Sequence, residues 1–409
     1  MIRMQDWLPA FLSGPQAGLL LSLPLVAALV GWFTNWIAIE MTFRPLRYMG
    51  WRFLHLGWQG IVPAKAGKMA GLVVDHALTR LTSLSELFRE LQPELLAAHI
   101  SDHLNRDMVS HIDDVMYRHH PVFWESLPWL VKQRIHARIR RQVPVVVDGI
   151  VDELAENIED LIDLRTMVVR QLSANPALVV RAFREVGASE LHFVVRSGLW
   201  FGLLFGCVQL AVWLIWPEPW LIPIAGLLVG WVTNWLALNL VFRPLEPVRI
   251  GPFRIQGLFL QHKAQVAQRF AALVADEVLT LDNLLQEIMQ GPQADRSRAI
   301  IRRHLTPVLD NNLVQAVVQF AVGAEGQAQL RQQVLGHVMS LSLHSLAEPR
   351  FHHERSRMIE NLLYRRMLVM SNADFQNVLR PAFKEDEWIL IALGAALGGM
   401  AGVLQMLLA

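Results

Sequence analysis

Four long apolar segments set the strongest limit on what this chain can fold into. A helix needs about 20 consecutive, mostly apolar residues to cross the hydrocarbon core of a bilayer. The sequence supplies four such segments: Gly18–Phe43, Gly198–Trp216, Trp220–Phe242 and Trp388–Leu408. With 53% hydrophobic and only 18% charged residues, the chain is also more apolar than soluble domains usually are. We therefore predict an all-α membrane protein with four transmembrane helices.

Net charge, the cysteine count and the lack of common catalytic motifs argue against several classes of function, although an enzyme remains the third possibility. The net charge of +1 gives no general attraction to nucleic acid, so no nucleic-acid partner is expected. Cys207 is the single cysteine, which excludes an intramolecular disulfide and a cysteine-based metal cage. The sequence contains no Walker loop, no His-Glu-x-x-His and no Gly-x-Ser-x-Gly motif. We predict no catalytic residues, no cofactor and no metal site.

One row of histidines has the spacing of a metal site. Imidazoles at four-residue steps share a helical face and can bind a transition metal. The row consists of His99, His103, Asp107 and His111. The equivalent part of the second half of the chain offers only isolated histidines such as His304. A solvated helix face is therefore the favoured interpretation.

Two of the four apolar segments have nearly the same sequence. VGWFTNWIAIEMTFRPL runs from residue 30 to 46, and VGWVTNWLALNLVFRPL runs from 229 to 245. Over 24–46 and 223–245, at an offset of 199, 13 of 23 residues are identical. The other two segments match at an offset of 196, which aligns Gly198, Gly202, Gly206 and Gln209 with Gly394, Gly398, Gly402 and Gln405. Because distinct motifs recur in the same order at nearly the same separation, we predict an internal duplication.

The duplication predicts two tandem two-span repeats, each enclosing a helical domain. Repeat 1 covers 17–216, with spans 18–43 and 198–216 around domain 44–197. Repeat 2 covers 217–409, with spans 220–242 and 388–408 around domain 243–387. Residues 1–16 form a short segment before the first span.

Basic residues near the ends of the spans predict the orientation in the membrane. Arg44 and Arg47 follow the first span and Arg243 and Arg249 follow the third, whereas the link 217–219 has no Lys or Arg. Both large domains are therefore expected in the cytoplasm, and both termini on the other side. Two-span repeats keep the same orientation, so the copies should be related by an axis along the membrane normal.

The domains begin with strand-like sequence and continue as helices. Residues 248–257 alternate apolar and polar residues about a Gly-Pro turn, and 47–60 is a looser equivalent, so each domain should carry a small β-hairpin near the membrane. Beyond the hairpins, apolar residues recur at three- and four-residue intervals, which predicts amphipathic helices. Helix boundaries in the first domain are expected at Pro93, Pro121, Pro128, Pro144 and Pro176. These helices either form a cytoplasmic bundle, which is favoured, or lie on the bilayer or line a lipid-sized groove.

A Thr-Asn pair lies inside each repeated span, as Thr34 and Asn35 and again as Thr233 and Asn234. A carboxamide exposed to hydrocarbon leaves its polar groups unpaired, at a cost of several kcal/mol. Both asparagines must therefore face protein or water. Each is either an interhelical hydrogen-bond clamp, which is favoured, or lines a polar pathway together with the threonines.

Helical geometry places each asparagine on a face of mostly small residues. This face contains Gly31, Asn35, Ala38 and Thr42 in the first copy and Gly230, Asn234, Ala237 and Val241 in the second. A different face, with Trp32, Trp36, Ile39 and Phe43, suits contact with lipid. The glycine ridges of the second and fourth spans are the expected partners of the asparagines, since glycine lets two backbones approach closely.

Basic residues and prolines after the repeated spans are predicted interfacial anchors. They are Arg44, Pro45, Arg243 and Pro244, together with Lys65 and Lys263 after the hairpins. The prolines should end the helices. The spans contain almost no ionisable group; Glu40 is the exception and is expected to reach the headgroups or pair with Arg44 at i+4.

The assembled residues resemble the signature of a bacterial membrane-protein family catalogued as domain of unknown function 445. The resemblance rests on Gly31, Trp32, Thr34, Asn35, Ala38, Phe43, Pro45, Gln59, Gly60 and Lys65, and on Gly230, Trp231, Thr233, Asn234, Ala237, Phe242, Pro244, Gln256, Gly257 and Lys263. It covers nearly the whole chain. The family's Ile-Pro-x-Lys continuation appears as GIVPAK in the first copy, whereas the second copy has GLFLQHK without the proline. The resemblance implies a multi-pass protein of the bacterial inner membrane and supplies no activity.

The leading functional prediction is a non-enzymatic membrane scaffold or envelope-associated factor that assembles through its asparagine and glycine helix faces. The alternative is a transporter or lipid-handling protein that uses a polar path between the repeats or a groove in the helical domains. The lipid bilayer is the expected partner, with membrane proteins or individual lipids as further candidates.

Overall fold

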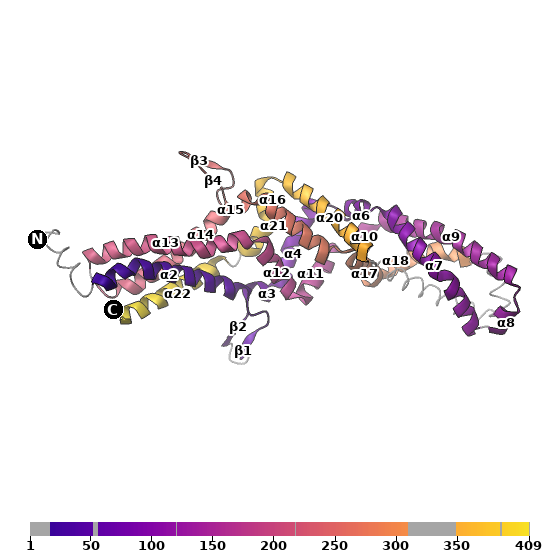
Figure 1. The fold of residues 1–409 in the computed structure, drawn as a ribbon, viewed down its shortest axis with the longest axis horizontal. Coiled ribbons are helices and arrows are strands. Elements are labelled where there is room, and N and C mark those ends of the chain that lie inside the picture. The colour runs from indigo at the N-terminus through magenta and orange to yellow at the C-terminus, as the bar shows by residue number, and fades with distance from the viewer. Residues whose placement is uncertain are drawn as a thin grey trace, which may run out of the picture. The chain divides into compact units, whose positions relative to one another are not determined.

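The computed structural model describes residues 17–51, 56–119, 121–216, 218–309, 349–384 and 387–408. Most of these residues are helical, and the strands form two small two-stranded sheets (Figure 1). The chain divides into two compact units, and both halves of the chain contribute to each unit. The predicted segment 1–16 lies outside the described residues. The predicted division into tandem repeats stays a prediction.

The first unit comprises residues 1–78, 169–269 and 367–409. Its elements are α2 (Ala17–Phe43), β1 (Met49–Trp51), β2 (Leu56–Trp58), α3 (Ile61–Ala64), α4 (Ala66–Val73), the π-helical turn η2 (Val74–Leu78), α12 (Pro176–Val186), α13 (Ala188–Ile215), α14 (Leu221–Phe242), β3 (Val248–Ile250), β4 (Phe253–Ile255), α15 (Leu258–Gln261), α21 (Asn372–Lys384) and α22 (Glu387–Leu408).

The second unit comprises residues 79–168 and 270–366. Its elements are α5 (Thr79–Leu81), α6 (Leu84–Glu90), α7 (Pro93–His119), α8 (Pro121–Ser126), α9 (Trp129–Glu156), α10 (Ile158–Leu161), the π-helical turn η3 (Val274–Val278), α17 (Leu281–Gln290) and α18 (Ala294–Leu309). The division between the units falls within α11 (Leu164–Ala174), α16 (Lys263–Leu273) and α20 (Pro349–Val369).

Four helices of the first unit, α2, α13, α14 and α22, are long and apolar enough to cross a membrane. They lie side by side in Figure 1, with α2 packed on α13 and α14 packed on α22. Three of them match the predicted spans to within one residue at each end. The fourth, α13, begins at Ala188 instead of Gly198, because residues 188–197 contain neither proline nor glycine to end a helix.

Most of the predicted proline boundaries are helix starts, but one is not. Helices begin at Pro93, at Pro121, directly after Pro128 and at Pro176. Pro144 instead lies inside α9, so the expected boundary there is wrong. A proline inside a helix costs about 3 kcal/mol. The continuous apolar stripe of α9, which packs on α7, outweighs that cost.

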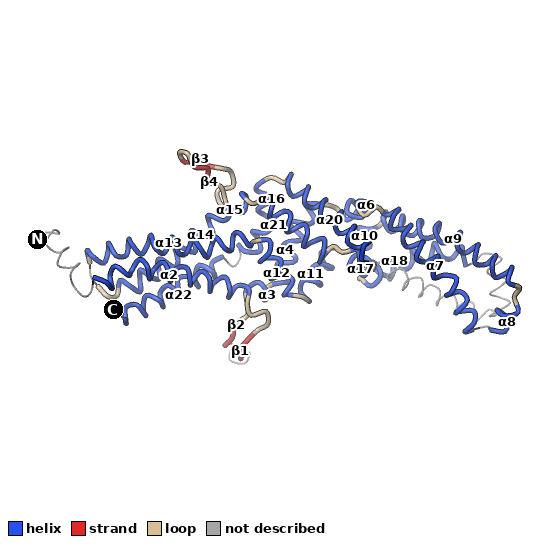
Figure 2. The backbone as a smooth tube through the Cα atoms, in the orientation of Figure 1, coloured by secondary structure: helices blue, strands red, loops and turns tan. Residues whose placement is uncertain are grey.

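Both predicted hairpins are present. Strand β1 pairs antiparallel with β2, and β3 pairs antiparallel with β4. Gly251, at the turn of the second hairpin, has a φ of +62°, a conformation that favours glycine. Figure 2 shows the two hairpins projecting from the helices of the first unit on opposite sides in this view.

Equivalent glutamine bonds close the bases of the two hairpins. Gln59 Nε2 donates to the carbonyl oxygen of Leu46 at 3.0 Å, and Gln256 Nε2 donates to that of Leu245 at 3.3 Å. Each glutamine thus ties the end of its hairpin back to the segment that follows the Arg-Pro pair.

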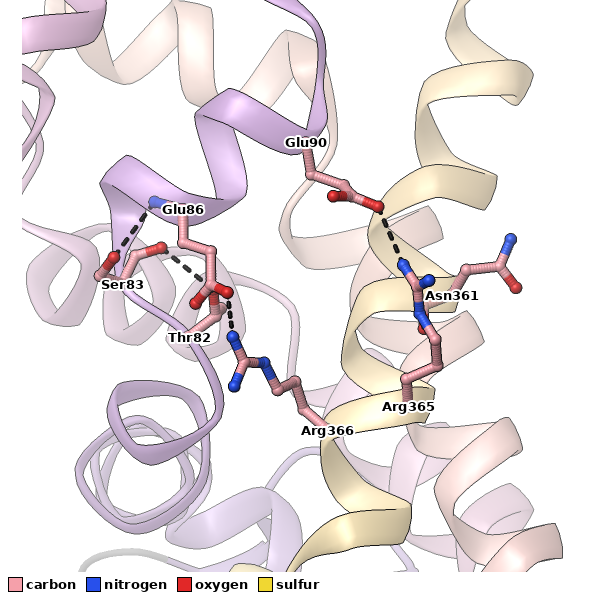
Figure 3. Close-up of polar contacts among 7 residues, drawn as sticks. All are labelled: Thr82, Ser83, Glu86, Glu90, Asn361, Arg365 and Arg366. Carbon is pink, nitrogen blue, oxygen red and sulfur yellow. Dashed lines mark hydrogen bonds and ion pairs between the residues drawn. The ribbon is translucent and has the colours of Figure 1, made fainter.

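In the second unit, charged contacts link α6 with α20, as Figure 3 shows. Arg365 Nη2 donates to Glu90 Oε1 at 3.0 Å, and the guanidinium of Arg366 contacts the carboxylate of Glu86. Ser83 caps the start of α6 by accepting a bond from the backbone N–H of Glu86 at 3.1 Å. Because these ion pairs are largely exposed, each contributes about 0–1 kcal/mol. They join segments of the chain that sequence patterns do not connect.

Candidate functional site

The two asparagines of the Thr-Asn pairs bond to the neighbouring membrane-spanning helices. Asn35 Nδ2 donates to the backbone oxygen of Val194 on α13 at 2.8 Å. Asn234 Nδ2 donates to the backbone oxygen of Leu390 on α22, also at 2.8 Å. Both side chains are buried. The two amides therefore face protein, and each ties one span to the next.

The threonines bond within their own helices. Thr34 Oγ1 donates to the backbone oxygen of Gly31 at 3.2 Å, and Thr233 Oγ1 donates to that of Gly230 at 3.3 Å. Both hydroxyls are buried. Within the described part of the chain, the Oδ1 oxygen of Asn35 is left without a hydrogen-bond partner. Each threonine hydroxyl thus has an acceptor within its own helix.

Glycines set the distance between the paired helices. A Cβ added to Gly31 or Gly198 would overlap the backbone oxygen of the other. The same relation holds for Gly226 and Gly398. A Cβ on Gly230 would overlap the backbone oxygen of Gly394, whereas a Cβ on Gly394 would overlap Nδ2 of Asn234. Farther along the two pairs, a Cβ on Gly202 would overlap the backbone oxygen of Ala27, and a Cβ on Gly206 or Gly402 would lie 2.7 Å from the Cα of Pro24 or Pro223. Sequence reasoning singled out most of these positions but missed Gly226, because the first copy of the repeat has Ala27 at the matching position.

A small cavity lies among all four spans. Its volume is about 30 Å³. It is lined by residues that include Gly31, Thr34, Gln209, Gly230 and Gln405. Both glutamines, Gln209 and Gln405, therefore line the same cavity as the glycine faces. The sequence indicated them only through their matching positions.

The residues predicted to face lipid differ in exposure, and the prediction is wrong for Phe43. Trp32 and Trp36 are exposed on α2, whereas Phe43 is completely buried. The guanidinium carbon of Arg184 lies 5.0 Å from the centre of the Phe43 ring. The last residue of α2 is thus covered by α12, which a periodicity argument on α2 alone could not foresee.

Glu40 pairs with two arginines. Arg44 Nε lies 3.6 Å from Glu40 Oε2, as the four-residue spacing predicts, but Arg184 Nη2 is closer at 2.8 Å. Arg184 is 144 residues away in sequence, so spacing gave no sign of it.

The predicted anchors have different environments. The repeated spans end at Phe43 and Phe242, so Pro45 and Pro244 follow helix ends as expected, and Arg44 and Arg243 are exposed. Lys65 is half-buried. Lys263 is also half-buried, and its Nζ donates to the backbone oxygen of Met370 at 2.5 Å, which caps the end of α20. Loss of hydration lowers the pKa of Lys263.

The histidine row on α7 is not simply a solvated face. The ring of His99 stacks on Phe351 with 4.1 Å between centroids, and the ring of His103 lies 4.9 Å from it. A flat imidazole packs well against a phenyl ring, which explains its half-buried position. Among the side chains that the structure describes, no group of three or more His, Cys, Asp or Glu could hold a metal ion. The side chains of Asp107 and His111 lie outside the described residues.

A second cavity lies where the Phe-Arg-Pro ends of the spans meet α12, α13 and α15. Its volume is about 80 Å³, and its lining is mostly apolar. The polar residues that line it are Asn35, Thr42, Glu190 and Asn234. We refer to it below as the Glu190 cavity. Sequence reasoning missed Glu190, whose only signal was an acidic residue in the first turn of a helix.

Glu190 is an unusual group for this position. Its side chain is only 8% exposed, and its Oε1 lies 3.3 Å from Nδ1 of His262. Its Oε2 is buried and has no hydrogen-bond partner among the described residues. A buried carboxylate oxygen without a donor is costly, so this atom is the strongest indication of a binding site in the first unit.

Comparisons with known proteins agree with the membrane assignment. No family model and no solved structure matches the chain. A protein of Cyanothece sp. (strain PCC 7425 / ATCC 29141) named UPF0754 membrane protein is 31% identical over 121 residues, which is 29% of this chain and 27% of the relative. A UPF0754 membrane protein of Bacillus cytotoxicus is 28% identical over 145 residues, 32% of this chain and 38% of the relative.

The similarity extends to further cyanobacterial proteins of the same name. The UPF0754 membrane protein of Synechococcus elongatus is 37% identical over 97 residues, 21% of this chain and 23% of the relative. The chain therefore spans less than two fifths of the length of each of these three curated relatives. Together with the four apolar helices, the comparisons identify the chain as a membrane protein that is similar to bacterial membrane proteins of unknown function.

Proposed function

We propose that the protein is a non-enzymatic scaffold of the bacterial inner membrane. The observation that carries this proposal is the use of both span asparagines as donors to the backbone of the neighbouring span. A pathway for polar solutes needs polar groups that are free to bind them, whereas these amides bond one helix to another. Rigid paired spans are what a membrane platform for other proteins requires.

The proposal includes an internal duplication and a cytoplasmic location for both helical regions. The bond from Asn234 to Leu390 is supporting evidence for the duplication, because offsets of 199 and 196 map it onto the bond from Asn35 to Val194. The guanidinium of Arg380 also lies 5.8 Å from the centre of the Phe242 ring, as Arg184 lies over Phe43. The excess of arginine at the Phe-Arg-Pro ends of the spans supports the orientation.

Replacing both asparagines by leucine should weaken the membrane region. Each Asn→Leu change removes one interhelical hydrogen bond. The backbone oxygen of Val194 or Leu390 then loses its side-chain donor. The expected loss is about 0.6–2 kcal/mol at each site. The measurement is the melting temperature of the detergent-solubilised Asn35→Leu/Asn234→Leu variant. Asn239→Leu is the matched control, because Asn239 Nδ2 donates to the Trp235 oxygen of its own helix and not to a neighbouring span among the described residues.

A flux measurement separates the scaffold from a transporter. Proteoliposomes that contain the protein should conduct protons and small ions no faster than empty liposomes. Ion flux that the double leucine variant abolishes without loss of melting temperature would contradict the scaffold and favour a polar path. Isolation of membrane-protein partners with the full-length protein as bait tests the scaffold directly, and their absence in the native membrane would count against it.

The hairpins are expected to lie in the head-group layer. Trp51 is 73% exposed and Met49 is 67% exposed, and both follow the end of the first span closely. Exposed aromatic residues beside arginine suit the interface between water and hydrocarbon. A nitroxide attached at Trp51→Cys, in a Cys207→Ser background, should be more accessible to oxygen than to a water-soluble nickel chelate in liposomes.

A matched label in the second unit controls the hairpin measurement. Val122 is 82% exposed on α8, so Val122→Cys should report the accessibility of an aqueous position. If the two labels gave the same ratio of oxygen to nickel accessibility, the interfacial role of the hairpin would be rejected.

One observation favours a second function, the handling of individual lipids. The Glu190 cavity lies at the end of the spans and combines an apolar lining with one buried carboxyl group. Such a cavity suits amphipathic molecules of the membrane, which combine an apolar part with a polar group.

A further inference from the structure

The Glu190 cavity contains an acceptor that lacks a donor. Glu190 is 6% exposed, and its Oε2 has no hydrogen-bond partner among the described residues. The other carboxylate oxygen, Oε1, faces His262. A second acceptor that lines the cavity, Oδ1 of Asn35, is also buried and lacks a partner in the described part of the chain. The site therefore calls for a ligand that donates hydrogen bonds.

The surroundings of Glu190 favour an organic cation. Four phenylalanines line the cavity, and they are Phe43, Phe183, Phe242 and Phe259. The faces of aromatic rings attract cations. None of the described lining residues is Lys or Arg. Arg184, whose guanidinium lies over the ring of Phe43, bonds to the carboxylate of Glu40.

Other cations fit the cavity less well. Magnesium and calcium prefer six or more oxygen ligands, whereas this lining is mostly apolar. A quaternary ammonium group has no N–H and could not donate to Glu190 Oε2. A primary ammonium group carries three N–H donors and one charge, which matches a carboxylate set among aromatic and aliphatic side chains.

We propose that the Glu190 cavity binds a primary ammonium group, carried either by an aminophospholipid head group or by a small soluble amine. The level of the cavity suits a head group, because its lining includes the last residues of the repeated spans, Phe43 and Phe242. The proposal is independent of the scaffold function. It supplies the ligand class for the lipid-handling alternative.

The test measures binding to the full-length, delipidated protein in detergent. Phosphatidylethanolamine should raise the melting temperature, and phosphatidylcholine, whose ammonium group has no N–H, should not. Glu190→Gln should weaken the binding of phosphatidylethanolamine at least about tenfold, because it removes the charge of a charge-assisted hydrogen bond. Glu185→Gln is the matched control, since it removes a charge from an exposed side chain on the neighbouring helix.

Further arms of the test keep the result unambiguous. Glu190→Gln should melt without lipid close to the wild-type temperature, because glutamine has the same shape as glutamate and its amide oxygen can still face His262. This result shows that the variant folds. Ethanolamine alone, at millimolar concentration, identifies the source: protection equal to that of the lipid assigns the site to a soluble amine. Equal stabilisation by the two phospholipids, or an unchanged affinity in Glu190→Gln, overturns the proposal. Both outcomes leave the asparagine bonds, and hence the scaffold test, untouched.

Discussion

Replacing Gly398 by alanine should destabilise the pairing of α14 with α22 severely. The added Cβ would overlap the backbone oxygen of Gly226, and it would lie 3.3 Å from the Cα of Gly230. Neither atom can move unless the whole helix moves, so the two spans must separate along the contact. Overpacking of a close contact typically costs about 1–3 kcal/mol, and a backbone collision is expected at or above the upper end. Thermal unfolding in detergent measures the effect.

The adjacent glycine provides the matched control. A Cβ added to Gly399 would lie 3.5 Å from the Cβ of Leu227, which is an ordinary van der Waals contact with a side chain. Gly399→Ala adds the same methyl group to the same helix and should leave the melting temperature nearly unchanged. Equal destabilisation by the two variants would contradict the prediction. The cause would then be helix propensity or lipid contact, and not the close approach of the two backbones.

Replacing Phe375 by alanine should be the most damaging single truncation in the first unit. Phe375 is completely buried on α21. Its ring centre lies 5.2 Å from that of Phe259, which in turn lies 5.8 Å from that of Phe242. Lys263 Nζ lies 5.4 Å from the centre of the Phe375 ring. Phe375→Ala removes a fully buried ring from this cluster, and losses for such changes run to about 3–5 kcal/mol.

The Phe375 effect has a control and a distinctive consequence. Val369→Ala removes part of a side chain that is 86% exposed at the end of α20, and it should change stability little. The Phe375→Ala variant should also expose Lys263 to water, because the phenyl ring no longer covers it. Recovery of hydration removes the cause that lowers the pKa of Lys263, so this pKa should rise toward its ordinary value. An unchanged melting temperature would show that the aromatic cluster does not hold α14, α15 and α21 together.

Sequence alone predicted those features of the candidate sites that depend on neighbouring residues of one helix. It did not predict the features that depend on other helices. A span asparagine could be placed on a protein-facing helix face because hydrocarbon cannot satisfy its polar groups. The glycine ridges indicated the partner helices, but the accepting oxygens, those of Val194 and Leu390, could not be named in this way. Gly226 was overlooked because the first copy has Ala27 at the matching position, and Glu190 was overlooked because no motif includes it. The importance of Gly226 comes from the opposing helix, and that of Glu190 comes from the cavity.

Local features of the sequence were enough to determine the spans, the ends of the repeated spans and one hairpin. Four apolar segments of bilayer length specified the spans, prolines specified where the repeated spans end, and a Gly-Pro turn specified a hairpin. These features follow from the length of a helix, the fixed φ of proline and the freedom of glycine, which act within a few residues.

Tertiary contacts decided the rest. Arg184 became the closest partner of Glu40, α12 covered Phe43, and packing on α7 kept α9 continuous through Pro144. In the same way, residues more than 250 positions apart meet where Arg365 bonds to Glu90. Each of these outcomes depends on groups that are distant in sequence. Such contacts form only when the chain folds, and their free energy then outweighs the conformational preferences of neighbouring residues.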